Sequence, residues 1–126
     1  MDDTIVTALA SGNYIDITTT GRRTGLPRRV EIVIHRFDGR WYISGSPSPR
    51  KRAWIANLEA DPMLTVHLKG QGPRADLSAV ARVIGAESER REVMPLIAAA
   101  WGRSDLDRMV AASPLIEVTF DDPATD

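Results

Sequence analysis

Apolar residues recur at every second position along several segments of the chain, and this pattern constrains the fold more than any other feature. Val30, Ile32 and Ile34 alternate with Glu31 and His35, which is typical of a strand with one buried face. The same kind of reading predicts six strands, at residues 14–20, 30–35, 41–44, 64–68, 75–83 and 115–120. Short turns join most of them, so we expect antiparallel pairing, and a small sheet of this kind tends to close into a barrel.

Apolar residues at three- and four-residue intervals predict three or four helices, at residues 4–10, 50–60, 87–101 and 104–112. Asp3 is the expected N-cap of the first helix. Pro95 should break or kink the third helix, and Ser104-x-x-Asp107 resembles a capping box for the fourth. The tail after Asp121 is acidic and is expected to fray. The expected fold class is therefore mainly β with helices (α+β).

The length and composition indicate a folded protein of one domain. A chain of 126 residues can bury a hydrophobic core, so residues 1–126 are expected to form a single domain. The chain has no cysteine, which excludes catalytic thiols, disulfides and thiolate metal sites. No apolar run approaches the length of about 18 residues needed to span a membrane, and the first residues are acidic rather than basic. We therefore expect a cytoplasmic protein.

Most catalytic motifs are missing from the sequence. His35 and His67 are the only two histidines and lie on different expected strands, with too few ligands nearby for a metal site. Each is interpreted as a residue of the barrel lining or the surface. The sequence contains neither the Gly-x-Ser-x-Gly motif of serine hydrolases nor a Walker or Gly-x-Gly-x-x-Gly phosphate loop. What remains is a pattern of basic residues.

Positive charge is concentrated in one part of a nearly neutral chain. The formal net charge is −1, yet residues 20–52 contain nine basic groups and two acids. This segment therefore carries +7 and the remainder −8, which suggests a local site for an anion. Chance clustering of charges on a small protein is the alternative.

Three arginines lie in or beside a tight turn. Two glycines and a proline punctuate Gly21–Pro27, and such a turn exposes backbone N–H groups. Arg22 and Arg23 lie within the turn, and Arg28 follows at the start of the next strand. Guanidinium groups placed in this way can reach an oxyanion with charge-assisted hydrogen bonds.

A second basic cluster falls in the first turn of the helix expected at residues 50–60. It consists of Arg50, Lys51 and Arg52. The helix dipole disfavours cations at this end, so a bound anion, which the free N–H groups also attract, would compensate them. Trp54 lies one turn further along and is placed to cover the edge of an aromatic cofactor. A solvated basic patch and a core tryptophan are the alternatives.

Several runs of sequence carry a resemblance to a known family. They are Ile-Thr-Thr-Thr-Gly-Arg-Arg-Thr-Gly-Leu-Pro-Arg at 17–28, Trp-Tyr-Ile-Ser-Gly at 41–45, Ala-Trp-Ile-Ala-Asn-Leu-x-Ala-Asp-Pro at 53–62 and Ser-Pro-Leu-Ile-Glu-Val at 113–118. Over nearly its whole length the chain resembles the deazaflavin-dependent nitroreductase family, the split-barrel flavin and deazaflavin oxidoreductases of actinobacteria. The resemblance implies a six-stranded antiparallel split β-barrel that is FMN-binding-like. It also implies coenzyme F-420, an 8-hydroxy-5-deazaflavin with a phosphate and an oligoglutamate tail, with FMN as the runner-up.

The resemblance further implies where the cofactor binds. It carries polar contacts onto Arg22, Arg23 and Arg28 and places Ala53 and Trp54 near the deazaflavin ring. In better-known members a lysine follows the third strand, whereas here that loop reads Gly-Ser-Pro-Ser-Pro and the basic residues are displaced to 50–52. The expected cofactor-binding residues are Arg22, Arg23, Thr24, Arg28, Ser46, Arg50, Lys51, Arg52, Ala53 and Trp54.

The implied activity is that of a reductase that depends on reduced F-420. Such a protein transfers a hydride from the deazaflavin to an electron-poor lipophilic acceptor, such as an enone, a quinone, a nitro compound or an unsaturated acyl chain. The cofactor supplies that chemistry, and the protein positions it and excludes water. Tyr14 and His35 are the candidate proton donors to the reduced product.

Two other classes of function stay open. The first is a non-enzymatic carrier or sensor that binds a fatty acid or a flavin in the same barrel. The second is a nucleic-acid or membrane-surface module, which is disfavoured for nucleic acid because the basic segment lacks interleaved aromatic residues. The expected partner is a small lipophilic substrate rather than a nucleic acid. A homodimer and a peripheral contact with lipid or the inner membrane are further possibilities.

Overall fold

The computed structural model describes residues 1–121 and contains ten helices and strands in this range. In chain order they are α1 (Asp3–Leu9), β1 (Tyr14–Thr20), β2 (Pro27–Phe37), β3 (Arg40–Ser44), α2 (Ala53–Ala60), β4 (Met63–Leu68), β5 (Ala75–Val83), α3 (Glu87–Trp101), α4 (Leu106–Ala112) and β6 (Leu115–Phe120). All six predicted strands are present, each within a few residues of the expected bounds.

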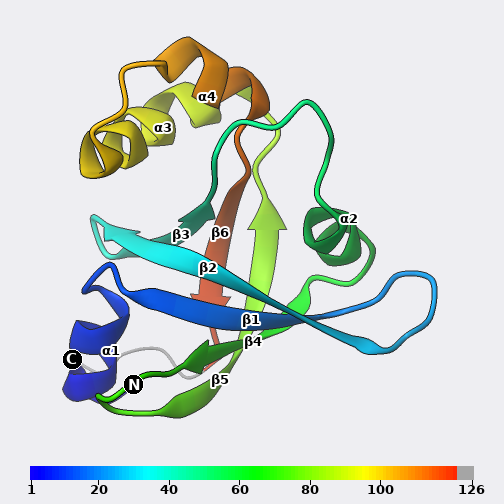
Figure 1. The fold of residues 1–126 in the computed structure, drawn as a ribbon, viewed down its shortest axis with the longest axis vertical. Helices are drawn as coiled ribbons and strands as arrows, with labels where there is room; N and C mark the ends of the chain where they lie inside the picture. The colour runs from blue at the N-terminus through cyan, green and yellow to red at the C-terminus, as the bar shows by residue number, and fades with distance from the viewer. Residues whose placement is uncertain (122–126) are drawn as a thin grey trace.

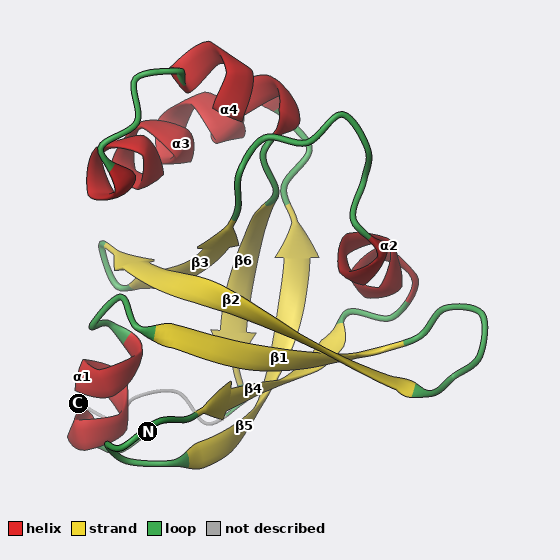
Figure 2. Cartoon of the chain, viewed as in Figure 1, coloured by secondary structure: helices red, strands yellow, loops and turns green. Residues whose placement is uncertain are grey.

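The six strands form one closed barrel in the order β1-β2-β3-β6-β5-β4, and every neighbouring pair is antiparallel. Figure 1 shows α1 beside one end of the barrel and the α3–α4 pair at the other. Helix α2 packs against β1 and β5. Figure 2 shows that the helices lie around the barrel rather than within it. The predicted fold class, a six-stranded antiparallel β-barrel with helices, is confirmed.

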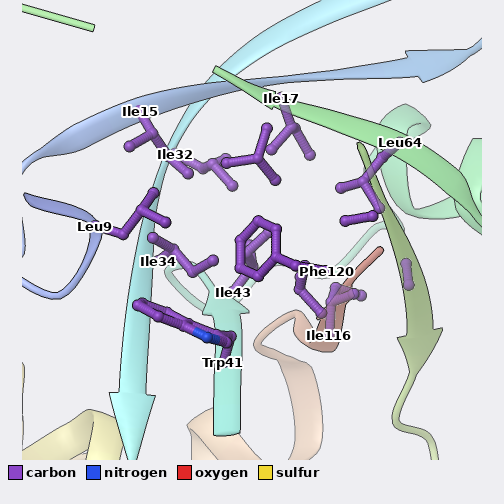
Figure 3. Packing of buried hydrophobic residues seen from close by; sticks show 14 of the residues in the cluster. Leu9, Ile15, Ile17, Ile32, Ile34, Trp41, Ile43, Leu64, Ile116 and Phe120 are labelled. Carbon is purple, nitrogen blue, oxygen red and sulfur yellow. The ribbon is translucent and has the colours of Figure 1, made fainter. Parts of the chain in front are cut away.

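Period-two alternation along the strands explains the barrel core. In β1 the buried Ile15 and Ile17 alternate with less buried neighbours, and in β2 the buried Ile32 and Ile34 do the same. Because successive strand residues point to opposite faces, these side chains all enter the barrel. Figure 3 shows them converging with residues from the other strands and α1, among them Leu9, Trp41, Ile43, Leu64, Ile116 and Phe120.

A second buried cluster joins α3 and α4 to the outer face of the barrel. Its members include Tyr42, Met94, Ile97, Met109 and Leu115. The guanidinium group of Arg90 donates to the backbone carbonyls of Ile84, Met109, Val110 and Ser113. Four backbone acceptors around one cation tie the two helices and the start of β6 together. This packing fixes the end of α3, where Trp101 lies.

Two predicted helix starts are wrong by a small margin. Asp2, not Asp3, is the N-cap of α1, and its carboxylate accepts a hydrogen bond from the Thr4 N–H at 2.7 Å. The Ser104-x-x-Asp107 capping box does not form, because α4 begins after Asp105 and has no side-chain cap.

The sequence predicted a break or a kink at Pro95, and helix α3 runs from Glu87 to Trp101 without a break. Its buried face of Val93, Met94 and Ile97 packs into the second cluster. This tertiary packing outweighs the loss of one helical hydrogen bond at the proline. The helix instead ends at Gly102, which has a left-handed conformation (φ 64°).

Two further observations concern the whole of the described range. No helix within residues 1–121 is both long and apolar enough to cross a membrane. The expected fraying of the acidic tail concerns residues 122–126, which lie outside the described residues.

Candidate functional site

The arginine turn, defined as residues 21–26 between β1 and β2, is closed by its own hydrogen bonds. The Gly21 N–H donates to the Leu26 carbonyl and the Gly25 N–H to the Gly21 carbonyl, both at 2.8 Å. The Thr24 hydroxyl accepts from the Leu26 N–H at 3.2 Å, and Gly25 adopts a left-handed φ of 71°. Figure 1 shows the turn projecting from the barrel beyond α2. The turn therefore presents Arg22 and Arg23 from a fixed backbone.

A buried amide from α2 holds this turn in place. The Asn57 Oδ1 atom accepts from the backbone N–H of Arg22 at 3.1 Å and from its guanidinium group at 3.2 Å. The Asn57 Nδ2 atom donates to the Thr19 hydroxyl at 3.2 Å. Asn57 and Thr19 are 3% and 1% exposed. A polar residue this deeply buried is expected to have its hydrogen bonds satisfied, and here the partners are strand β1 and the arginine turn.

A surface cavity of about 420 Å³ lies between the turn and α2. Its lining includes Arg22, Arg23, Thr24, Arg28, Ala53, Trp54 and Asn57. Within residues 1–121, Arg23 and Arg28 form no ion pair or side-chain hydrogen bond, and Arg22 bonds only to a neutral amide. Arg29 also lines the cavity, but its guanidinium group pairs with Asp16 at 2.8 Å. Three positive charges therefore face this cavity without a bonded acid.

The basic residues 50–52 do not lie in the first turn of α2 as predicted. The helix begins at Ala53, and Arg52 is its N-cap residue with extended backbone. The Lys51 ammonium pairs with Glu59 at 2.7 Å, and the Arg52 guanidinium donates to the Ser46 carbonyl at 2.8 Å. Residues 45–52 are held by these tertiary contacts, which is why helical spacing misplaced the start of the helix.

A second surface cavity, of about 510 Å³, lies on the other side of Trp54. Its lining includes Tyr14, Ile32, Ser44, Ser46, Arg52, Trp54 and Trp101. Trp54 is only 8% exposed and contributes to the walls of both this cavity and the arginine cavity. Aromatic residues from β1, α2 and α3 thus surround one opening, with basic groups next to it.

The structure divides the predicted cofactor residues among three places. Arg22, Arg23, Thr24, Arg28, Ala53 and Trp54 surround the 420 Å³ cavity. Ser46, Arg52 and Trp54 border the 510 Å³ cavity, together with the predicted proton donor Tyr14. Arg50 and Lys51 line a third cavity of about 340 Å³, shared with Arg52 and Arg90.

His35 lies apart from both cavities that share Trp54. It stacks on Phe37 with 5.7 Å between ring centroids and contacts Trp101 at 5.4 Å. Its Nε2 atom is buried, and no hydrogen-bond partner is found within the described part of the chain. Burial lowers the pKa of His35 below its usual 6.5. His35 therefore packs against Phe37 and Trp101, and Trp101 also lines the larger cavity.

His67 is part of a surface network. Its ring contacts the Thr18 hydroxyl and the Asp76 carboxylate, both at 2.7 Å. Within residues 1–121, no group of three or more histidine, aspartate or glutamate side chains is arranged to hold a metal ion.

The sequence did not assign a role to three residues of the site. They are Asn57, Trp101 and Glu31, which hold the turn or line a cavity. Asn57 interrupts the apolar face of α2, and a lone amide at a helical core position is a usable signal for a buried hydrogen-bond network. Trp101 is the last residue of α3, far in sequence from the other site residues, and no local pattern marks it.

The donor set fits a cofactor that has an anionic end and a flat aromatic end. Unpaired guanidinium groups beside a glycine turn suit phosphate oxygens, and a cavity bordered by Tyr14, Trp54 and Trp101 suits a planar ring. The two cavities have Trp54 in common and are therefore neighbours. F-420 and FMN both have this character.

Solved structures with the same fold are described as proteins with several different roles. An F420-H2 dependent reductase (FDR-A) is 22% identical, with a TM-score of 0.60 over 84% of this chain and 93% of its own. The heme storage protein HutZ of Vibrio cholerae is 14% identical, with a TM-score of 0.72 over 99% and 91%. A structure described as a domain-swapped dimer is 20% identical, with a TM-score of 0.61 over 93% and 95%. At these identities the likeness establishes the fold alone.

Sequence comparison is more specific. No curated protein matches the chain at a significant level. A family model, however, matches residues 1–119, which is nearly the full length, and describes an F420H(2)-dependent quinone reductase. The predicted resemblance to deazaflavin oxidoreductases is confirmed, and the chain belongs to the F420H(2)-dependent quinone reductase family.

Proposed function

We propose that this protein is a reductase that binds reduced F-420 across Trp54, with the phosphate end at the arginine turn and the ring in the larger cavity beside Tyr14 and Trp101. The observation that carries the proposal is the set of three arginines, Arg22, Arg23 and Arg28, that face one cavity without a bonded acid. Family membership supports F-420 as the cofactor. FMN has a single phosphate, and an arginine cluster favours the more highly charged tail of F-420.

The residues have separate tasks in this proposal. When bound, the reduced deazaflavin supplies a hydride. The arginine turn binds the anionic tail, and Trp54 and Trp101 cover the ring and keep water from it. Arg52, held by the Ser46 carbonyl, adds a cation to the wall of the ring cavity. Thr24 contributes by fixing the turn.

The acceptor is an electron-poor lipophilic molecule, and a quinone is the first choice because of the family. Nitro compounds, enones and unsaturated acyl chains are the other candidates. Reduction of a quinone requires a proton on its oxygen in addition to the hydride. Tyr14 is 63% exposed at the edge of the 510 Å³ cavity, and its hydroxyl is the proposed proton donor. His35 does not line that cavity but contacts Trp101, which does.

Titration of the purified protein with F-420, FMN, a fatty acid and an oligonucleotide tests the proposal. We expect F-420 to bind at least about tenfold more tightly than FMN, which corresponds to about 1.4 kcal/mol. Reduced F-420 should then be oxidised when a quinone is added. Tight binding of F-420 or a fatty acid without turnover of any acceptor class would indicate a carrier instead. Preference for FMN would overturn the choice of cofactor.

Matched arginine variants locate the site. Arg28→Ala should weaken F-420 binding by about 1.5–3 kcal/mol, the usual worth of a hydrogen bond to a charged group. Arg91→Ala, on α3 and paired with Glu87 and Asp107, is the control and should leave affinity unchanged. A homodimer and a contact with lipid also stay predictions, and sedimentation velocity and co-sedimentation with anionic vesicles test them.

A further inference from the structure

We propose that Asn57 is a positioning residue that fixes Arg22 for an anionic ligand while leaving the charge of Arg22 uncancelled. The inference rests on the proposed function, because it concerns the cavity assigned to the phosphate end of the cofactor. It adds Asn57 to the proposed site and explains the residue type. A neutral amide holds Arg22 without cancelling its positive charge, so the cavity stays positive.

The geometry shows one amide acting on two parts of Arg22. Asn57 Oδ1 accepts from the Arg22 backbone N–H and from the guanidinium group, so the main chain and the charged end are both restrained. Asn57 Nδ2 is anchored on the Thr19 hydroxyl in β1. Because both Asn57 and Thr19 are almost fully buried, this anchor is rigid. Arg22 is thereby held by a carbonyl oxygen, which leaves its remaining N–H groups free to bind an anion.

Arg29 shows the opposite arrangement in the same cavity. Its guanidinium group pairs with the Asp16 carboxylate at 2.8 Å, and Asp16 also pairs with Lys69. A carboxylate partner cancels much of the positive potential that an arginine offers to a ligand. The chain thus holds one arginine of this cavity with an acid and another with an amide, and only the second arrangement preserves the attraction for an anion.

The test compares two substitutions of Asn57. One changes the charge of the cavity and the other removes the restraint on Arg22. Asn57→Asp keeps an acceptor for Arg22, and the Thr19 hydroxyl can reverse its bond and donate to the new carboxylate. The turn should stay in place, but the carboxylate cancels one positive charge. Asn57→Ala removes the acceptor, so the Arg22 side chain keeps its charge but is no longer held in place. Three quantities are measured: hydrogen exchange of the Arg22 amide, the melting temperature, and the affinity for F-420 and for inorganic pyrophosphate.

The two variants are expected to change different readouts. Asn57→Asp should keep slow exchange at the Arg22 amide and a melting temperature close to wild type. It should nevertheless bind both ligands about tenfold or more weakly, and the same loss is expected for Arg22→Ala. Asn57→Ala should lose amide protection and melting temperature, with a smaller loss of affinity than Asn57→Asp. Arg29→Gln is the matched control and should lose less affinity than Arg22→Ala, because its charge is already paired.

The outcomes distinguish this inference from the proposed function. If wild type binds F-420 and Asn57→Asp binds it equally well, the role of Asn57 is overturned while the proposed function stands. If wild type binds pyrophosphate with the expected sensitivity to Asn57→Asp but does not bind F-420, the proposed function fails and the role of Asn57 stands. If wild type binds neither ligand, both are overturned. Fast exchange of the Arg22 amide in wild type would also overturn the role of Asn57.

Discussion

Replacement of Gly21 by alanine tests whether close packing inside the arginine turn holds the candidate site together. A Cβ atom at Gly21 would lie 2.9 Å from the Thr24 hydroxyl and 3.1 Å from the Leu26 carbonyl oxygen. Neither neighbour can withdraw freely, because each takes part in a hydrogen bond of the turn. Overpacking of this kind costs about 1–3 kcal/mol. For a domain of this size, that lowers the melting temperature by several degrees.

Thermal melts and F-420 titrations of Gly21→Ala supply the measurement. Gly72→Ala is the matched control, since a Cβ atom there meets nothing within 4 Å and the residue has no left-handed φ; its stability should be unchanged or slightly raised. The double variant Gly21→Ala/Thr24→Ala removes the closer of the two contacts, so its loss should be less than the sum of the single losses. A melting temperature for Gly21→Ala equal to that of Gly72→Ala would refute the packing argument.

Three further predictions concern His35, Lys51 and Trp54. Burial lowers the pKa of His35 below 6.5 in the folded protein. The free energy of unfolding should therefore be highest above about pH 6.5 and should decrease as the pH falls from there toward the folded-state pKa. In urea titrations, the stability of His35→Leu should depend less on pH than that of the wild type. Lys51→Ala breaks an exposed pair with Glu59 and should change stability by less than about 1 kcal/mol in chemical denaturation, which a large loss would contradict. Trp54→Ala should lose about 3–5 kcal/mol of stability, and the milder Trp54→Phe should still weaken F-420 binding in a fluorescence titration.

The barrel was predictable because its signals are local. Alternation in segments such as Val30–Ile34 places side chains on one face whatever the rest of the chain does. The arginine turn was predictable for the same reason, since its glycines and Thr24 close it through hydrogen bonds within the turn itself. A short polar segment with two glycines has few other ways to join antiparallel strands.

The start of α2 could not be predicted from local pattern. Residues 50–52 have ordinary helix propensity, yet the bond from Arg52 to Ser46 and the bond from the Ser48 N–H to the Ala112 carbonyl keep this segment extended. The bond to Ala112 comes from a part of the chain that only the fold brings close. The same is true of Trp101, which packs on His35 from the end of a helix far away in the sequence. Tertiary contacts override local propensity at both places.

Helix α2 links the two halves of the proposed cofactor site. Trp54 and Asn57 are separated by about one helical turn and therefore lie at neighbouring positions of one helical face. Trp54 forms the wall between the two cavities, and Asn57 fixes the arginine turn. One helical turn thus sets where an anion and an aromatic ring can lie relative to each other. A ligand that engages both cavities restrains α2 from two sides, so its anionic end and its ring should contribute to binding cooperatively rather than independently.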